Sequence, residues 1–226
     1  MTLTGEGEHR LSLDLIARVR CALGRVRAES VASPFSALVT RAEGKYFSNG
    51  FDLDYVNETK SSANQLKRGK SLTSGLASIT ADLMSLQMPT ICAVTGDASA
   101  VGFMLAFSHD YVAMHGDNGF LCMSELSNLL SHRHFLSLMK AKVRDDEVFK
   151  ELVLRSRKIP AMEAMDRGVI DLVGETATET VEEAVKLGHM LAKKNWNGKV
   201  YASLRKEAFP EICRAVGIPG ASDKER

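Results

Sequence analysis

The sequence carries almost no net charge, since 29 lysine and arginine residues stand against 28 aspartate and glutamate residues, a formal net charge of +1. A protein whose main partner is nucleic acid usually has a clear excess of basic residues, so this balance argues against that class. Long apolar runs are also missing, and none approaches the roughly 20 residues that cross a bilayer. The N-terminal residues match neither a secretory signal nor an arginine-rich transit peptide. We therefore expect no nucleic-acid partner and no membrane span.

Cysteine is scarce as well, with four residues in the chain. Cys21, Cys92, Cys122 and Cys213 lack the paired spacing of zinc ligands, so we predict no metal site. Cys92 and Cys122 fall in expected core strands, and reduced, buried cysteines in an intracellular compartment are the default expectation. There is no internal repeat. A chain of 226 residues with 45% hydrophobic and 25% charged content suits one domain with a sizeable core.

The residues from Met88 to Ala113 form the most informative stretch, MPTICAVTGDASAVGFMLAFSHDYVA. Thr90–Thr95 is apolar and β-branched, which predicts a buried parallel strand. Small residues then dominate from 96 to 102, and these allow two backbones, or a backbone and a ligand, to approach closely. An apolar helix is expected to start near Phe103, and a strand at Asp110–Met114. Alone, this pattern is more typical of an ordinary tight turn between a strand and a helix.

A second motif, at Lys45–Leu53, makes the stretch at 88–113 more specific. An expected strand at residues 35–40 leads to KYFSNGFDL at Lys45–Leu53, about 40 residues before PTICAVTGDASAVGF. In this order and spacing the two motifs resemble the crotonase (enoyl-CoA hydratase/isomerase) superfamily. GKYFSNGFDL, FSHDYV and MSEL resemble most its plant peroxisomal members that convert 3-enoyl-CoA to 2-enoyl-CoA. The resemblance extends from about Thr2 to about Val216, and it implies a first strand longer than the one that begins here at Met1.

The resemblance implies an α/β fold, a crotonase-like superhelix of ββα turns followed by a helical portion. We expect the ββα core at residues 1–175 and the C-terminal helical portion of the same domain at residues 176–226. The apolar spacing of the sequence predicts amphipathic helices at residues 12–29, 72–86, 126–142, 144–157 and 178–194, and a last helix at Val200–Ile212. It also predicts a short helix that ends at a glycine before a strand, within residues 159–173.

Acyl-CoA thioesters become acidic at the α carbon only when the enolate oxygen is stabilised, and two backbone N–H groups can supply about 3 kcal/mol each. By resemblance these donors are the N–H groups of Phe51 and Val101. Val101 stands where the family usually has glycine or alanine, and a β-branched residue there could narrow the slot. An inert turn is the alternative. The same two loops are expected to bind substrate through the residues Ser48, Asn49, Gly50, Asp52, Leu53, Ala100 and Gly102.

The base is expected to be Glu125 in the MSEL motif. Hydratases of the superfamily use two glutamates, and the first aligns with Met104, whose thioether cannot transfer a proton. One glutamate suffices for an isomerase, which takes a proton from one carbon and returns it to another. Glu125 lies between apolar segments that would desolvate its carboxylate, although an exposed helix cap is the alternative. Asp52, the rival acid, is assigned a structural role in holding its loop.

Other polar groups are weaker candidates. The segment 132–134, His132, Arg133 and His134, replaces the glycine and proline that line the acyl pocket in the resembling isomerases, so it bears on the shape of that pocket. Two histidines two positions apart do not share a helix face, and no acid or cysteine completes a metal set. Ser108, His109 and Asp110 are adjacent in sequence and cannot form a catalytic triad.

The function that follows is isomerisation of 3-enoyl-CoA to trans-2-enoyl-CoA in fatty-acid β-oxidation, with coenzyme A as part of the substrate and no cofactor. Family resemblance further implies a homo-oligomer, a trimer or hexamer. It implies a peroxisomal location, although residues 222–226 are not a serine-lysine-leucine signal and a cytoplasmic location is the other expectation. Two alternatives stay open. One is a catalytically impaired paralogue that binds acyl-CoA or a protein, and the other is thioester hydrolysis or decarboxylation in the same site.

Overall fold

Strand β4 (Thr90–Val94) lies at the centre of the fold, and all five of its residues are buried. Its side chains alternate between two hydrophobic clusters, with Ile91 and Ala93 in one and Cys92 and Val94 in the other. Burial on both faces is what a continuous apolar strand requires. The protein is described from a computed structural model, which covers residues 1–5, 7–32, 36–116, 120–123 and 133–219.

Two sheets run through the described residues. The first is parallel throughout, in the order β1-β2-β4-β6-β9, and the second has the order β3-β5-β7-β8, with only the β7–β8 pair antiparallel. Besides β4, the strands are β1 (Thr2–Leu3), β2 (Leu38–Ala42), β3 (Tyr46–Ser48), β5 (Asp97–Ser99), β6 (Tyr111–His115), β7 (Phe120–Cys122), β8 (Ile159–Pro160) and β9 (Leu172–Gly174).

Each turn of the chain adds one strand to each sheet and then a helix. The pairs β2–β3, β4–β5 and β6–β7 repeat this step, which confirms the predicted ββα superhelix. The helices are α1 (Leu13–Ala32), α2 (Leu53–Asn57), α3 (Ser62–Met84), α4 (Val101–Phe107), α5 (Arg133–Lys142), α6 (Asp146–Val153), α7 (Ala161–Asp166), α8 (Ala177–Ala192), α9 (Gly198–Ala208) and α10 (Pro210–Val216).

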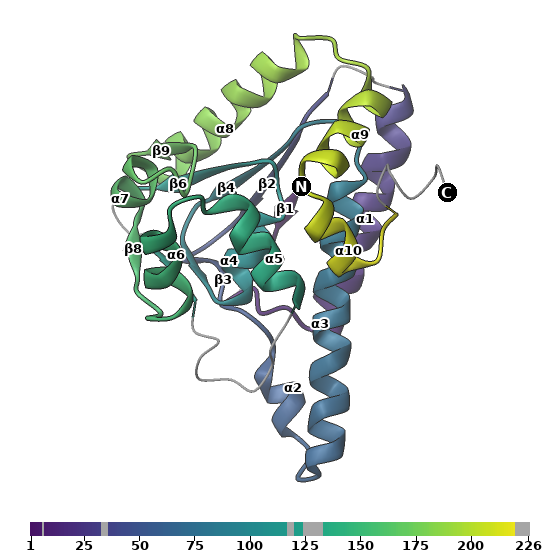
Figure 1. Cartoon of the computed structure of the whole chain (residues 1–226), viewed down its shortest axis with the longest axis vertical. Coiled ribbons are helices and arrows are strands. Elements are labelled where there is room, and N and C mark those ends of the chain that lie inside the picture. The colour runs from purple at the N-terminus through teal and green to yellow at the C-terminus, as the bar shows by residue number, and fades with distance from the viewer. Residues whose placement is uncertain (6, 33–35, 117–119, 124–132, 220–226) are drawn as a thin grey trace.

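Helices cover both faces of the first sheet (Figure 1). On one face Ala184 and Leu191 of α8 belong to the cluster that contains Ile91 and Ala113. On the other face, α1 and α3 pack side by side, and α3 extends beyond the body of the molecule with α2 next to its far half. The C-terminal helices α9 and α10 return to α3 and α5. Among the described residues, no helix combines the length and the apolarity needed to cross a membrane.

Some predicted boundaries are wrong. The single last helix expected at residues 200–212 is two helices, because Phe209 leaves helical geometry (φ −129°, ψ 57°) and Pro210 has no N–H to continue the ladder, so it starts α10 instead. Strand β2 ends at Ala42, two residues beyond the expected strand. Among the cysteines, Cys21 is exposed on α1, whereas the expectation was burial.

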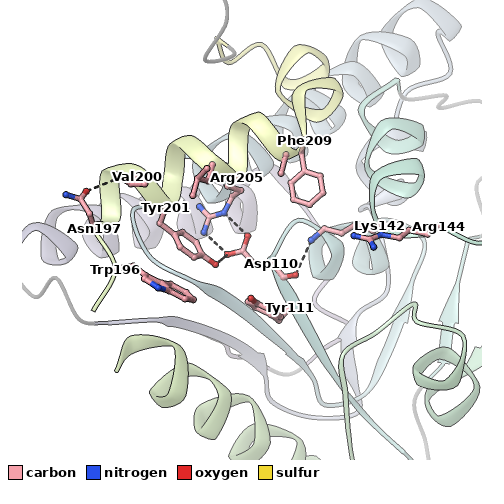
Figure 2. Close-up of a pocket in the computed structure, with 12 residues that line it drawn as sticks. Asp110, Tyr111, Lys142, Arg144, Trp196, Asn197, Val200, Tyr201, Arg205 and Phe209 are labelled. Carbon is pink, nitrogen blue, oxygen red and sulfur yellow. Dashed lines mark hydrogen bonds and ion pairs between the residues drawn. The ribbon is translucent and has the colours of Figure 1, made fainter. Parts of the chain in front are cut away.

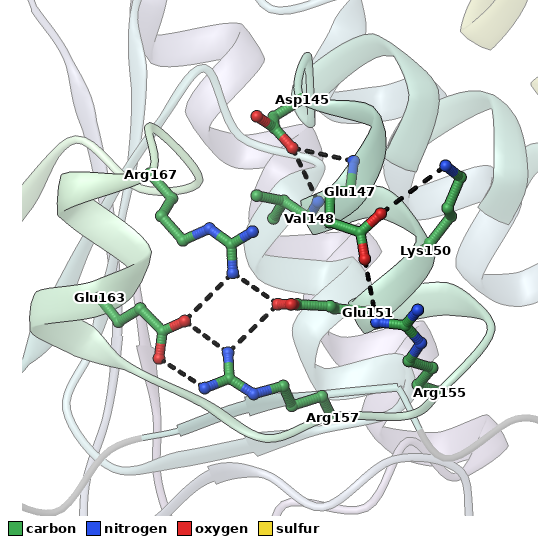
Figure 3. Close-up of polar contacts among 9 residues, drawn as sticks. All are labelled: Asp145, Glu147, Val148, Lys150, Glu151, Arg155, Arg157, Glu163 and Arg167. Carbon is green, nitrogen blue, oxygen red and sulfur yellow. Dashed lines mark hydrogen bonds and ion pairs between the residues drawn. The ribbon is translucent and has the colours of Figure 1, made fainter.

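Four side chains between α6 and α7 form a closed ring of alternating charge (Figure 3). Arg157 pairs with Glu163 and with Glu151, the latter at 3.2 Å. Arg167 pairs with the same two carboxylates, at 2.5 Å to Glu151 and 3.2 Å to Glu163. Because each guanidinium contacts both carboxylates, the ring ties the two helices together across β8. Its members are partly solvated, so water screens each single pair.

A buried ion pair fastens the C-terminal helices to the sheet. Arg205 on α9 donates from Nε and Nη2 to the two carboxylate oxygens of Asp110, each at 2.6 Å. The remaining donors of this guanidinium go to main-chain carbonyls near the end of α3, including Leu86 O at 2.7 Å. The Arg205 side chain is 3% exposed and that of Asp110 13%. Desolvation is the largest single effect on the Asp110 carboxyl and raises its pKa, but the charge and hydrogen bonds of Arg205, the Lys142 charge and the Thr90 N–H together outweigh it, so the pKa of Asp110 is lowered.

The buried His109 makes stability depend on pH. Its Nδ1 faces the Leu105 carbonyl at 3.0 Å and must donate, so Nε2 accepts from the Thr40 hydroxyl at 2.8 Å. Burial lowers the pKa of His109 to about 4. Between pH 6.5 and pH 4 the unfolded chain therefore binds the extra proton, and stability falls as the pH falls. We expect this residue to remove about 3 kcal/mol of unfolding free energy between pH 7 and pH 4.

Urea denaturation of the wild type and of His109→Gln at several pH values measures this effect. The glutamine variant is expected to be less stable at pH 7 but to lose less stability on acidification, because glutamine does not titrate. Equal slopes for the two proteins would contradict a neutral, buried His109.

Candidate active site

The two predicted motifs meet in the structure because their strands are neighbours. Strand β3 pairs in parallel with β5, so the loops that follow these strands leave the same edge of the sheet. A Cβ built on Gly50 would lie 3.4 Å from the Ala100 Cβ and 3.9 Å from the Val101 nitrogen. Residues 50 apart in sequence are therefore in contact at the point where the oxyanion donors are predicted.

The contact between the motifs depends on a glycine. A Cβ on Gly102, in the first turn of α4, would lie 2.1 Å from the Ser48 carbonyl oxygen at the end of β3. Gly96 is equally restricted, since its Cβ would lie 2.0 Å from the Lys45 carbonyl oxygen. The small residues expected to permit close backbone approach do so at these two positions.

Ala100 holds an unusual backbone conformation directly before the predicted donor. It is a non-glycine residue with positive φ (φ 52°, ψ −119°), and its N–H donates to the Cys122 carbonyl at 2.7 Å. Val101 follows as the first residue of α4, where an N–H has no acceptor within the helix. The Val101 side chain is buried in the main hydrophobic core. The unusual backbone conformation of Ala100 therefore sets the orientation of the Val101 N–H.

The loop that carries Phe51 is braced by the start of the chain. Leu11 N donates to the Gly50 carbonyl at 2.7 Å, and Asp52 N donates to the Leu11 carbonyl at 3.3 Å. Leu11 and Phe51 thereby form a parallel bridge. In this bridge Leu11 forms its hydrogen bonds with Gly50 and Asp52, the two neighbours of Phe51. The N–H of Phe51 itself therefore points away from residues 8–11.

Side chains reinforce this brace. Glu8 accepts from Asn49 twice, through its carbonyl from the backbone N–H at 2.8 Å and through its carboxylate from Nδ2 at 3.1 Å. Arg10 Nε donates to the same carboxylate at 2.6 Å. The Asn49 and Arg10 hydrogen bonds lower the pKa of Glu8. Sequence reasoning missed this segment, because no local pattern relates residue 8 to residue 49.

His9 completes the brace on the strand side. Its Nδ1 donates to the Tyr46 carbonyl at 2.9 Å, and its carbonyl accepts from the Ser48 hydroxyl at 2.8 Å. The residue is 8% exposed, and Nε2 is buried without a hydrogen-bond partner among the described residues. The predicted substrate-binding Ser48 therefore has its hydroxyl engaged inside the protein.

We expect Glu8→Ala to lower kcat about tenfold with little change in KM, since oxyanion donors bind the transition state more strongly than the ground state. Glu8→Gln can still accept from Asn49 and should restore most of the rate. Steady-state kinetics on an enoyl-CoA substrate measure the split, and Glu43→Ala, which removes an exposed carboxylate outside the brace, is the control. A change in KM without a change in kcat would contradict the positioning role. So would a Glu8→Gln variant whose kcat is as low as that of Glu8→Ala.

The remaining site predictions fall in different places. Asp52 caps α2, accepting from the Tyr55 N–H at 3.3 Å, which fits the structural role assigned to it, and Leu53 is the first residue of that helix. Met104 is completely buried in the core. Glu125 and His132 lie outside the described residues, as does the side chain of Arg133. Strand β7, which ends three residues before Glu125, is the strand whose Cys122 carbonyl holds Ala100.

Among the described residues, the other polar side chains singled out from the sequence form no second catalytic set. His109 is a buried core residue, as described above, and His134 is buried on α5. In the described part of the chain, no three histidine, cysteine, aspartate or glutamate side chains gather as they would around a metal ion. Sequence reasoning also missed the network of Asp110 and Arg205, which are 95 residues apart.

Comparison with known proteins identifies the family and the fold. The model of the enoyl-CoA hydratase/isomerase family matches residues 10–209. Two Arabidopsis thaliana proteins, enoyl-CoA delta isomerase 2, peroxisomal, and enoyl-CoA delta isomerase 3, are 41% and 42% identical over 220 residues, which is 96% of this chain and 91% of each relative. An enoyl-CoA isomerase from Mycobacterium tuberculosis has the same fold, with a TM-score of 0.81 at 18% identity over 96% of this chain and 88% of that one. A family protein from Pseudomonas syringae superposes with a TM-score of 0.79 at 20% identity, covering 96% of this chain and 90% of that one. The chain belongs to the enoyl-CoA hydratase/isomerase family and has the crotonase fold.

Proposed function

We propose that this protein is an enoyl-CoA isomerase that converts 3-enoyl-CoA to trans-2-enoyl-CoA, a step of fatty-acid β-oxidation. The observation that carries the proposal is the meeting of the Gly50 loop with the start of α4, beside the strand that leads to Glu125. Identity of 41% to a peroxisomal enoyl-CoA delta isomerase over almost the whole chain supports the same reaction.

The proposed mechanism moves one proton between two carbons. Glu125 removes a proton from carbon 2 of the acyl chain, and the electron pair is delocalised over the thioester oxygen and the double bond. The N–H groups of Phe51 and Val101 stabilise the negative charge on that oxygen. The protonated Glu125 then returns the proton to carbon 4, which leaves the double bond between carbons 2 and 3. The steps use only these groups, so we propose no cofactor.

Hydration of a 2-enoyl-CoA is the less suitable reaction for this site. It needs a second acid–base group at position 104, where the residue is a buried methionine. The loops around Gly50 would instead contribute to holding the thioester, with Ser48, Asn49, Ala100 and Gly102 acting through their backbone and Asp52 and Leu53 through the fold of the loop.

An isomerase assay tests the proposal directly. Purified protein is mixed with a 3-enoyl-CoA and the conjugated 2-enoyl thioester is followed by its absorbance, beside a hydratase assay on 2-enoyl-CoA. We expect isomerisation without hydration. Saturable binding of acyl-CoA by calorimetry without turnover would overturn the proposal in favour of a binding paralogue, and release of free coenzyme A would indicate thioester hydrolysis instead.

We also propose that copies of the chain associate into a trimer or hexamer. Several large apolar side chains are exposed to solvent in a single copy of the chain, and contact with another copy would bury them. Among them are Leu154, Met162 and Met190, which are 53–61% exposed. Size-exclusion chromatography with light scattering gives the mass. A single species near 24.7 kDa would contradict the proposal.

A peroxisomal location is proposed from two of the Arabidopsis thaliana relatives, whose names place them there. Immunofluorescence of the endogenous protein beside a peroxisomal marker tests it, and diffuse cytoplasmic signal would contradict it.

A further inference from the structure

One groove of the described structure lies away from the candidate active site. It encloses about 640 Å³ between α9, the start of β6 and the end of α5. We call it the α9 groove. Its apolar wall is Trp196, which precedes α9, together with Val200 and Leu204 on α9, and its cationic end holds Lys142 and Arg144. None of the residues predicted to bind substrate lines it. A concave site of this volume with apolar walls and a few charged groups is typical of small-molecule sites.

The groove has two unlike ends. Figure 2 shows Trp196 at one end and Lys142 with Arg144 at the other, with Asp110, Tyr201 and Arg205 between them. Trp196 is 44% exposed, and Val200 and Leu204 are 54% and 58% exposed. The Trp196 ring stacks on the Tyr201 ring, with centroids 5.5 Å apart and planes 19° apart, so Tyr201 holds the indole at the edge of the groove.

The polar groups between the two ends of the groove already form hydrogen bonds with one another. The Asp110 carboxylate is held at both oxygens by Arg205, and the Tyr201 hydroxyl donates to it at 3.3 Å. No free carboxylate is therefore presented to a ligand. A positively charged occupant would find no partner on this floor.

The two cations at the other end form no ion pair with a described carboxylate, and the charges of Asp110 and Asp171 act on Lys142 from beyond ion-pair distance. Lys142 Nζ donates to the carbonyls of His109 at 2.8 Å and Asp110 at 3.1 Å, and no carboxylate of the described residues lies within 4.0 Å of it. Arg144 is exposed and likewise forms no ion pair within the described residues. Burial lowers the pKa of Lys142, a cost that a bound anion would offset. With one carboxylate against three cations, the lining carries an excess of two positive charges.

We propose that the α9 groove is a second ligand site, which binds a small amphipathic carboxylate. The carboxylate contacts Arg144 and Lys142, and the apolar body lies along Val200 and Leu204 toward Trp196. The positive charges of Lys142 and Arg144 favour an anionic group at one end. The exposed apolar wall favours an apolar chain along the rest of the groove. This site goes beyond the proposed isomerase activity and does not depend on it.

Trp196 allows a direct test, because it is the single tryptophan of the chain. Full-length protein is titrated with octanoate while tryptophan emission is recorded, and calorimetry gives the stoichiometry. We expect a saturable change in emission with octanoate and none with octan-1-ol at the same concentration. Arg144→Gln should weaken octanoate binding about tenfold, as expected for loss of a charge-assisted contact. Leu204→Gln should weaken it through the apolar wall.

Lys199→Gln is the matched control, since it removes one positive charge from α9 at a residue that does not line the groove. It should bind octanoate like the wild type. Equal affinity for Arg144→Gln, or equal binding of octan-1-ol, would overturn the proposal. So would a change in Trp196 emission that follows protein concentration without octanoate, because the groove would then be an interface between copies. Octanoate that binds elsewhere would give heat without a change in Trp196 emission, which also counts against the site.

Discussion

Replacing Glu125 with glutamine is expected to lower kcat for isomerisation about a thousandfold, within the range found for general acid–base groups. Glutamine keeps the size and the hydrogen-bonding reach of the side chain but cannot take up the proton from carbon 2. The proposed oxyanion donors, the N–H groups of Phe51 and Val101, remain in this variant, so acyl-CoA binding should change little. The rate of appearance of the conjugated thioester, measured with calorimetric binding of the substrate, separates the two effects.

Asp52→Asn is the matched control, because Asp52 is the other carboxylate beside a predicted oxyanion donor. Asp52 accepts from the Tyr55 N–H as the cap of α2, and asparagine caps helices about as well. This variant should therefore retain most of the activity. If Asp52→Asn loses turnover while Glu125→Gln retains it, the assignment of the base is wrong.

Replacing Gly102 with alanine is expected to cost about 3 kcal/mol of unfolding free energy or more. The added Cβ would lie 2.1 Å from the Ser48 carbonyl oxygen and 2.8 Å from its carbonyl carbon. Neither atom belongs to a flexible side chain, so α4 must move away from β3. That movement separates the Gly50 loop from Val101, and isomerase activity should fall even in the fraction that stays folded.

Gly24→Ala tests the same substitution in open space. Gly24 is exposed within α1, and no atom lies within 4 Å of a Cβ built there. Alanine favours a helix by about 1 kcal/mol relative to glycine, so this variant should be more stable than the wild type. Urea denaturation should therefore show a lower unfolding free energy than the wild type for Gly102→Ala and a higher one for Gly24→Ala. Destabilisation by both, or by neither, would contradict the steric account.

Local patterns determined much of the fold in advance. The apolar run at 90–95 and the helical spacings predict strand β4 and most helices, because each depends on neighbours within a few residues. The turn expected at 96–102 is wrong in part, because Asp97–Ser99 form strand β5 of the second sheet. The order of two motifs predicts the ββα superhelix through its resemblance to a family. The break at Phe209 was missed although Pro210 signals it, because the apolar spacing continues through residues 200–212.

The geometry of the site is a property of the tertiary structure. The sequence by itself determined the two loops, the small residues that let them meet and the family to which they belong. Only the folded chain decided what holds them, since Glu8 reaches Asn49 across 41 residues and Cys122 holds Ala100 from a neighbouring strand. The same is true of Arg205 on Asp110 and of the groove between α9 and β6. Such contacts leave no periodic trace in sequence, because the packing of the sheets, and not chain proximity, brings their partners together.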